Sequence, residues 1–96
     1  MSPSGAGISA SLKRKLAEAF RPQALEIVNE SHLHAGHQEQ FDGRGETHLR
    51  IRITSDAFRG MGRLERHRAI NSLAREEFAA GLHALAIEAR TPEELQ

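Results

Sequence analysis

The chain has 96 residues, a length that fits one small domain and leaves little room for a second. Its 13 Lys and Arg residues balance its 13 Asp and Glu residues, so a globally basic nucleic-acid-binding protein is not indicated. The absence of Cys excludes a disulfide scaffold, a thiol nucleophile and any thiolate metal site made by this chain alone. No apolar run approaches the ~20 residues of a membrane span, and the N-terminus lacks a signal-peptide pattern, so we expect a cytoplasmic protein without a membrane partner.

The N-terminal third predicts a helix followed by a strand. We expect residues 1–7, rich in Ser, Pro, Gly and Ala, to be flexible and residues 8–96 to form the domain. Apolar side chains then recur every four residues, as in an amphipathic helix, at Ile8, Leu12, Leu16 and Phe20. Pro22 ends this helix and moves Arg21 out of the helical region. The β-type run at 24–29 predicts the first strand.

The middle of the chain predicts a loop, a strand and a turn. Residues 30–46 are polar, with glycines and no apolar periodicity, and indicate a long loop. Residues 48–54 alternate strictly, with Leu49, Ile51 and Ile53 on one face, which is typical of a strand with one solvated side. Residues 55–62 form a turn region that contains two glycines.

The last third predicts a long helix, a strand and a short helix. Residues 63–80 show helical periodicity; Leu64 lies near the start, and the expected buried stripe is Ile70, Leu73, Ala74 and Phe78. Gly81 closes this helix. Residues 82–89 predict a third strand in which His83, Leu85 and Ile87 share a face, and 91–94 form a capping box that starts a helix. The sequence therefore predicts a single small α/β (α+β) domain of order helix-strand-strand-helix-strand-helix, with a three-stranded mixed sheet covered on one face.

Charge is distributed in blocks along the chain. Residues 49–75 carry seven Arg against Asp56 and Glu65, a net charge of +5, and form the only candidate electrostatic footprint. Four of these arginines lie on or near the second predicted helix and could contact phosphates: Arg63, Arg66, Arg68 and Arg75. The alternative interpretation is that they are solvated surface charges. The chain has no G-x-x-G pair, the loop by which KH domains grip single strands.

Six histidines in a chain without Cys are the unusual feature. His32, His34 and His37 crowd the long loop, but their spacing matches no established metal site, and taken alone they favour a solvated polar loop over a closed metal site. His67 is flanked by arginines on a helix and is interpreted as a surface or half-buried residue. His48 and His83 each lie at the start of a predicted strand, and His83 fits either a structural or a ligand role.

Enzyme signatures are absent from the sequence. There is no G-x-S-x-G elbow, P-loop or dinucleotide-binding glycine pattern, and the Glu pairs at 76–77 and 93–94 lie on helices with diverging side chains. A chain of this size also has too thin a core for a deep cavity. We therefore expect neither an enzyme nor a small-molecule substrate.

Four blocks in order and spacing resemble the BolA-like proteins over about residues 8–95. They are LEIVNESHLH (25–34), ETHLRIRITSDAF (46–58), RHRAINSLAREE (66–77) and GLHALAIEARTPEE (81–94). The resemblance implies an α/β fold of the class II KH type. It also implies a monothiol glutaredoxin as partner, a [2Fe–2S] cluster shared with that partner and its glutathione, and a role in iron–sulfur cluster trafficking or in iron or stress regulation. Some bacterial members of the family are transcriptional regulators that bind DNA.

The resemblance also implies metal ligands. The family's V-H-A-L histidine falls on His83, here within Leu-His-Ala-Leu, and its E-S-x-x-H histidine falls on His34. The histidine of the T-H-F-[KR] motif falls on His48, which Leu follows here instead of Phe. The loop adds His37 and His32, so these two and His48 remain alternatives to His34 as the second ligand.

The chemistry of the chain agrees with that implication. A pair of imidazoles can replace a pair of thiolates on one iron of a [2Fe–2S] cluster, as in Rieske centres. Because this chain has no Cys, the thiolates have to come from outside, and we expect no cluster in the isolated chain. Two hypotheses follow: a cluster-sharing adaptor of a monothiol glutaredoxin, and a DNA-binding regulator that uses the Arg-rich helix. The neutral overall charge and the absent G-x-x-G pair favour the first.

Overall fold

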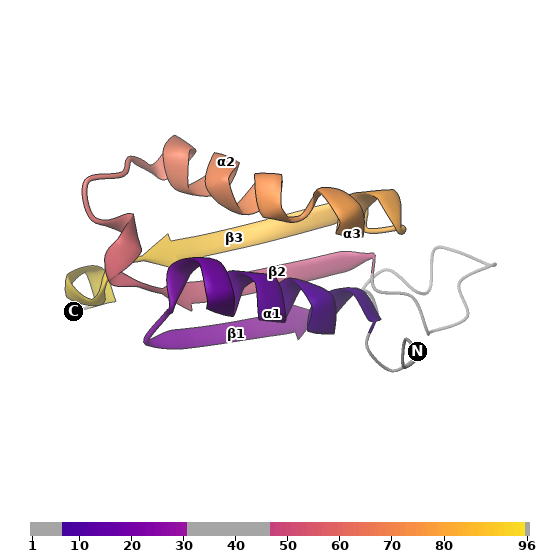
Figure 1. The fold of residues 1–96 in the computed structure, drawn as a ribbon, viewed down its shortest axis with the longest axis horizontal. Coiled ribbons are helices and arrows are strands. Elements are labelled where there is room, and N and C mark those ends of the chain that lie inside the picture. The colour runs from indigo at the N-terminus through magenta and orange to yellow at the C-terminus, as the bar shows by residue number, and fades with distance from the viewer. Residues whose placement is uncertain (1–6, 31–46, 96) are drawn as a thin grey trace.

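Three strands form one sheet, and the helices cover one of its faces (Figure 1). The structure, a computed structural model, describes residues 7–30 and 47–95. Its regular elements in chain order are α1 (Gly7–Phe20), β1 (Ala24–Asn29), β2 (His48–Thr54), α2 (Arg63–Leu73), α3 (Arg75–Ala79) and β3 (Ala84–Arg90). The strand order is β1-β2-β3, with β1 antiparallel and β3 parallel to β2. The predicted α+β domain with a three-stranded mixed sheet is confirmed.

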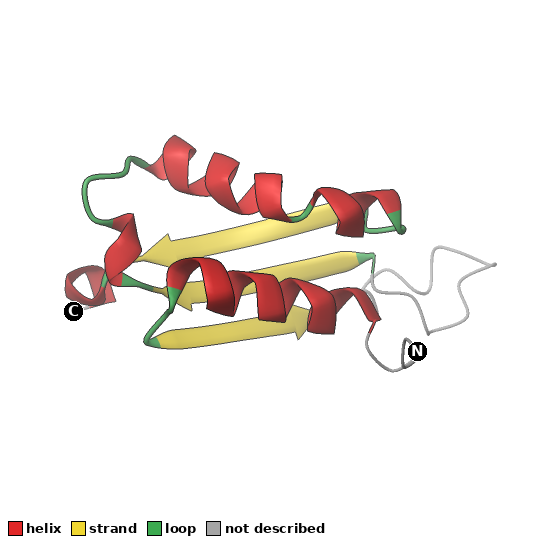
Figure 2. Cartoon of the chain, in the orientation of Figure 1, coloured by secondary structure: helices red, strands yellow, loops and turns green. Residues whose placement is uncertain are grey.

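The central strand β2 divides its side chains between the two faces of the sheet. Leu49, Ile51 and Ile53 are at most 2% exposed, as the alternation predicted. The pairing places Ile27 of β1 and Ile87 of β3 on either side of Ile51, so the inward face is apolar across all three strands. The other face carries the polar side chains of β2 and has no helix over it (Figure 2).

The core fills the layer between this apolar face and the helices. Leu12 and Leu16, four residues apart on α1, are fully buried. Ile70 of α2 is buried from the other side. Between β2 and α2, the 3-10 turn Asp56–Phe58 adds Phe58, which is fully buried and whose ring centroid lies 4.9 Å from that of Phe20.

The predicted single helix over residues 63–80 is two helices. The backbone leaves the helical conformation at Ala74 (φ −91°, ψ 13°), between α2 and α3. The Ala74 N–H is shared between the carbonyls of Ile70 and Asn71, at 3.2 and 3.1 Å. This shared bond marks a tightened turn rather than a chain break.

The break between α2 and α3 changes which side chains face the core. Ile70 and Ala74 are buried as expected, but Phe78 is 37% exposed and its neighbour Glu77 is buried in its place. The prediction of a buried Phe78 was therefore wrong. Leu64 is also exposed, because it lies six residues before Ile70 and so about 120° around the helix from it.

Gly81 ends the helical segment, as predicted. Its φ is +128°, a conformation that favours glycine. The Gly81 N–H donates to the Phe78 carbonyl at 3.2 Å, and the Leu82 N–H donates to the Glu77 carbonyl at 3.0 Å. These two bonds form a Schellman motif, which satisfies the last carbonyls of α3.

Strand β3 begins two residues later than predicted and extends one residue further, because the peptides after Gly81 close the helix instead of joining the sheet. The N–H groups of His83 and Ala84 both donate to the Thr47 carbonyl, at 2.8 and 3.0 Å. His83 therefore lies at the entrance to β3, outside the strand face it was predicted to share with Leu85 and Ile87.

Two chain reversals lie at the other end of the sheet. Arg21, before Pro22, adopts a positive φ of 44°, outside the right-handed helical region as predicted. The predicted C-terminal helix is a 3-10 helix, Pro92–Leu95, and the Thr91 N–H donates to Glu94 Oε1 at 3.0 Å, which is one half of the predicted capping box. Among the described residues, no helix is long and apolar enough to cross a membrane.

Candidate functional site

Two histidines that are 35 residues apart in sequence meet at one end of the sheet. His48 opens β2, and His83 precedes the parallel strand β3, so the parallel pairing brings their backbones together. Thr47 fixes both: its carbonyl accepts from the His83 N–H, and its Oγ1 lies 2.9 Å from His48 Nδ1. The imidazole rings are 6.1 Å apart between centroids and nearly perpendicular, at 84°. We call Thr47, His48 and His83 the imidazole end.

The imidazole end has the chemistry of half a metal site. Two imidazoles bound to one metal ion, with metal–nitrogen distances of about 2.0–2.1 Å, have centroids roughly 5 Å apart, against the 6.1 Å observed here. His83 is exposed and His48 half-buried, so a partner can reach this end. The donor set fits a group that takes imidazoles here and thiolates from a second protein.

The loop histidines His32, His34 and His37 lie outside the described residues. The described chain stops at Glu30 and resumes at Thr47, and the Glu30 N–H donates to the His48 carbonyl at 2.8 Å. Both ends of that loop are thus attached at the imidazole end. Within the described ranges, no group of three or more His, Cys, Asp and Glu side chains could hold a metal ion.

His67 lies apart from the other two described histidines. It is half-buried on α2, as predicted, on the side of the helix that faces β3.

The arginines of β2 are paired on the open face of the sheet. Arg50 bonds Glu30 at 2.8 Å and Glu88 at 3.0 Å, while Arg52 lies 3.4 Å from Glu26 and 3.5 Å from Glu88. Each arginine is thus placed between carboxylates of the two flanking strands. Two of the seven arginines of the +5 block are therefore paired here with acids from other segments, a pairing that only the strand register reveals.

Arg66 holds α2 to the C-terminal segment. Its guanidinium bonds both carboxylate oxygens of Glu94, at 2.7 and 3.0 Å, and donates to the carbonyls of Met61 and Ala89, each at 2.9 Å. It also lies over the Phe58 ring, 5.7 Å from the centroid. The hydrogen bonds from Arg66 lower the pKa of the Glu94 carboxyl to about 2. The donors of Arg66 are thus used inside the domain, which leaves little for a phosphate.

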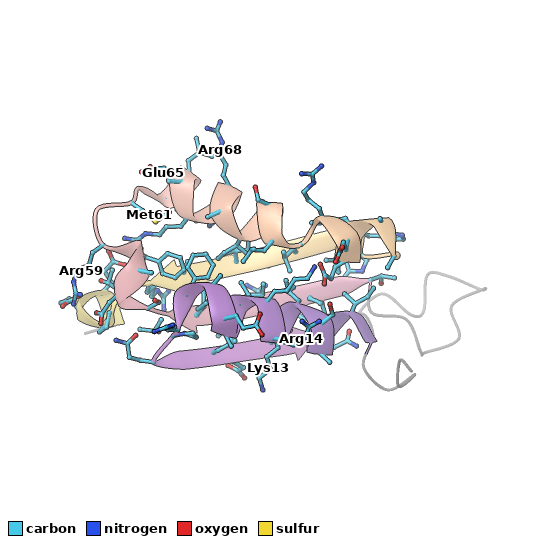
Figure 3. All side chains as sticks on the ribbon, in the orientation of Figure 1. Lys13, Arg14, Arg59, Met61, Glu65 and Arg68 are labelled. Carbon is cyan, nitrogen blue, oxygen red and sulfur yellow. The ribbon has the colours of Figure 1, made fainter. Side chains whose placement is uncertain are left out.

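A second arginine strengthens the same region. Arg59, labelled in Figure 3, pairs with Asp56 at 2.6 Å and with Glu93, and the hydrogen bond from Arg59 lowers the pKa of Glu93. We call the five residues of these two clusters the ion-paired end: Asp56, Arg59, Arg66, Glu93 and Glu94. It lies at the C-terminal ends of β2 and β3, opposite the imidazole end.

The other three candidate phosphate contacts have open side chains. Arg63, Arg68 and Arg75 are exposed and make no hydrogen bond or ion pair with another described residue. Arg68 projects away from the domain on the outer side of α2 (Figure 3). Arg63 lies five residues earlier, about 140° around the helix, so these two do not form one compact phosphate-binding surface.

A buried carboxylate that the sequence did not single out joins α3 to α1. Glu77 is 2% exposed, accepts from Ser11 Oγ at 2.6 Å and pairs with Lys15 at 3.1 Å. Burial raises the pKa of Glu77, but the hydrogen bonds from Ser11 and Lys15 lower it more, and the net direction is downward. Its neighbour Glu76 is exposed but pairs with the same Lys15 ammonium at 2.8 Å, so the prediction that the two side chains diverge was wrong. Glu77 is therefore a structural ion-pair partner.

Comparisons with known proteins agree with this fold. A family model described as BolA-like protein matches residues 16–94. A Sinorhizobium sequence named "Uncharacterized protein in cobS 5'region" is 56% identical over 87 residues, covering 91% of this chain and 94% of its own length. BolA-like protein 1 of Bos taurus is 41% identical over 85 residues, covering 88% of this chain, which spans only 59% of the bovine protein.

A solved structure is similar over nearly the whole chain. The BolA domain of SufE1 from Arabidopsis thaliana superimposes with a TM-score of 0.78 and 41% identity, covering 97% of this chain and 99% of that domain. Family model, curated relatives and solved fold thus point the same way. The chain belongs to the BolA-like protein family.

Proposed function

We propose that this protein is an adaptor that pairs with a monothiol glutaredoxin and shares a [2Fe–2S] cluster with it and with glutathione. The adaptor would act in the cytoplasm, in iron–sulfur cluster trafficking or in iron or stress regulation. The adaptor would bind the cluster and present it to other proteins without catalysing a reaction, so no enzymatic step is assigned to it. The observation that carries the proposal is the His48–His83 pair at the imidazole end of a chain that has no Cys.

His83 is assigned as the first ligand. It is exposed, and its backbone is fixed by the bond to the Thr47 carbonyl, so its direction is set before a partner binds. His34 occupies the family position for the second ligand, and His48 is the imidazole that lies beside His83. A bound [2Fe–2S] cluster supplies a redox-active, transferable iron–sulfur unit, and these residues orient one side of it.

Co-expression with the same organism's monothiol glutaredoxin, followed by visible absorption and circular dichroism of the purified complex, tests the proposal. We expect a spectrum that differs from that of the glutaredoxin alone, and we expect His83→Ala to abolish that difference. His67→Ala is the matched control, because it also removes one imidazole, but one that lies apart from the imidazole end. A His83→Ala complex with the wild-type spectrum contradicts the ligand assignment.

The second ligand is identified by single and double replacements. We expect His34→Ala to alter the spectrum and His34→Ala combined with His48→Ala to abolish it. His37→Ala and His32→Ala are tested in the same way, since both belong to the same loop. If none of these replacements changes the spectrum, the assignment of His34 and His48 as donors is contradicted.

DNA binding is a second candidate function, favoured by the three open arginines Arg63, Arg68 and Arg75. If α2 contacts phosphates, binding to duplex DNA should weaken with salt, with a log–log slope of about −0.9 for each neutralised phosphate. Replacing Arg68 and Arg75 together should make that slope less negative by the amount expected for the loss of about two phosphate contacts. Undetectable or salt-independent binding at about 100 mM salt contradicts this candidate.

A further inference from the structure

The outer edge of β3 has no strand partner among the described residues. The sheet order β1-β2-β3 leaves β3 paired on one side only. The Ala84 N–H donates to Thr47 and the Arg90 carbonyl accepts from Ser55, so alternate residues from Ala84 to Arg90 direct their peptide groups toward β2. The intervening residues, Leu85, Ile87 and Ala89, therefore direct their N–H and C=O groups outward.

One contact confirms this assignment of the edge. Arg66, which lies outside the sheet on α2, donates to the Ala89 carbonyl at 2.9 Å. That carbonyl is thus occupied, while the outward peptide groups of Leu85 and Ile87 have no hydrogen-bond partner among the described residues.

The N-terminal half of the β3 edge has few of the features that usually prevent strand pairing. β3 is seven residues long and contains neither Pro nor Lys. Leu85 and Ile87 are only half-buried, although they pack against the core. A regular strand that begins with four apolar residues, Ala84–Ile87, and has one free side is a template for another strand.

A groove between α2 and β3 runs along this edge. It encloses about 540 Å³ and is lined on the helix side by Met61, Arg63 and His67, and on the sheet side by Ile87 and Arg90. Figure 3 places Met61 where the chain enters α2, on the opposite side of the helix from Arg68. The groove is therefore partly apolar, with cationic side chains at its rim.

The charges of the groove select an acidic occupant. Its two carboxylates are already committed, Glu94 to Arg66 and Glu88 to the arginines of β2. Arg63 has no ion-pair partner among the described residues, and Arg90 interacts with Glu94 only through a minor coulombic attraction. An acidic segment would neutralise these cations.

We propose that the free edge of β3 and the groove beneath α2 bind an extended, acidic peptide segment of a partner protein as an added strand. The peptide backbone would pair with Leu85 and Ile87. Its side chains would alternate between Arg63 and His67 on the helix side and Arg90 on the open side. The groove is lined by the C-terminal half of β3, from Ile87 to Arg90, whereas His83 precedes the strand, so the proposal goes beyond the proposed cluster adaptor.

A labelled peptide of alternating Val and Glu, about eight residues long to match β3, serves as the probe. Fluorescence anisotropy with the full chain should show saturable binding below about 1 mM, and the same peptide with Lys in place of Glu should not bind. Amide protons of Leu85 and Ile87 should shift and become protected from exchange. Failure to bind, or equal binding of the Lys peptide, overturns the proposal.

Backbone methylation separates strand pairing from simple charge attraction. In two versions of the probe, N-methyl groups are placed on alternate residues, each version covering one set. Since only one set of peptide amides faces β3, one version should lose binding and the other should keep it. Equal affinity of both versions for the protein contradicts strand addition.

Arg63→Ala should weaken the Val-Glu peptide about threefold, as expected for one exposed ion pair. Arg68→Ala, on the outer face of the same helix, is the matched control and should have no effect.

A single-stranded oligonucleotide that binds at this edge while the peptide does not would assign the groove to nucleic acid and overturn the proposal. Concentration-dependent dimerisation that protects the same amides would assign it to a second copy, with the same consequence.

Discussion

At the ion-paired end, Arg66 makes four hydrogen bonds and covers an aromatic ring, whereas at the imidazole end the exposed His83 ring has one edge-on contact with another imidazole. Both ends are closed by residues that are far apart in sequence. Their chemistry differs: one end satisfies its charges internally, and the other presents nitrogen donors to an outside partner. The difference indicates that stability and binding are assigned to opposite ends of the same three strands.

The largest effect on stability is expected from Arg66→Ala. The change leaves the carbonyls of Met61 and Ala89 and the carboxylate of Glu94 without this donor, and it removes the cation from the Phe58 ring. We expect the free energy of unfolding to fall by about 1–3 kcal/mol, the range for partly buried polar groups left unpaired. Urea denaturation followed by circular dichroism measures it.

Arg68→Ala is the matched control for Arg66→Ala. The two arginines are two residues apart on α2, but Arg68 is exposed and has no described partner. Its replacement should change the free energy of unfolding by less than about 0.5 kcal/mol. If both variants lose the same stability, the loss does not come from the contacts of Arg66, and the ion-paired end is not the structural end.

A smaller, pH-dependent effect is expected at the ion-paired end. The pKa of Glu94 is about 2 in the folded chain, against an ordinary value of 4.5, and the pKa of Glu93 is also lowered. A carboxyl with a lowered pKa adds stability above its ordinary pKa, and that contribution is lost as the pH falls toward the folded value. Stability should therefore decline between about pH 4.5 and pH 2.

Glu94→Gln isolates the contribution of that carboxyl. The variant should be less stable than the wild type at pH 7 and should lose less stability on acidification, because one titrating group is gone. Thermal denaturation at a series of pH values measures both quantities. Parallel pH profiles of the two proteins would show that the Arg66–Glu94 pair does not contribute.

Local sequence patterns predicted the strands better than the helix break. The alternation around Ile51 marked β2 with its correct bounds, because each residue faces either core or solvent. Nothing local marks the break at Ala74, since alanine favours helices. The buried partner that accompanies the break, Glu77, depends on Ser11 and Lys15, which lie 66 and 62 residues away.

The site was predictable to a similar degree. The resemblance to the BolA-like proteins singled out His83, but its proximity to His48 depends on the parallel pairing of β2 with β3, which periodicity does not give. Arg66 looked like a surface charge because its partner Glu94 lies 28 residues on, beyond β3. Residue type and spacing thus identified the candidate donor side chains, the histidines and arginines. Only the strand register shows which of them are paired inside the domain and which remain available to a partner.

The smallest effect on stability is expected at the imidazole end. His83→Ala removes an exposed ring whose described side-chain contact is the edge-to-face contact with His48, while the backbone bond from His83 to Thr47 is kept. We expect a change below about 0.5 kcal/mol in the free energy of unfolding, measured by urea denaturation beside Arg66→Ala. A double replacement of His48 and His83 isolates their coupling, which should stay within about 0.5 kcal/mol because the rings meet at a half-exposed edge. A loss comparable to that of Arg66→Ala would make the imidazole end structural and remove the argument that its donors are held ready for a partner.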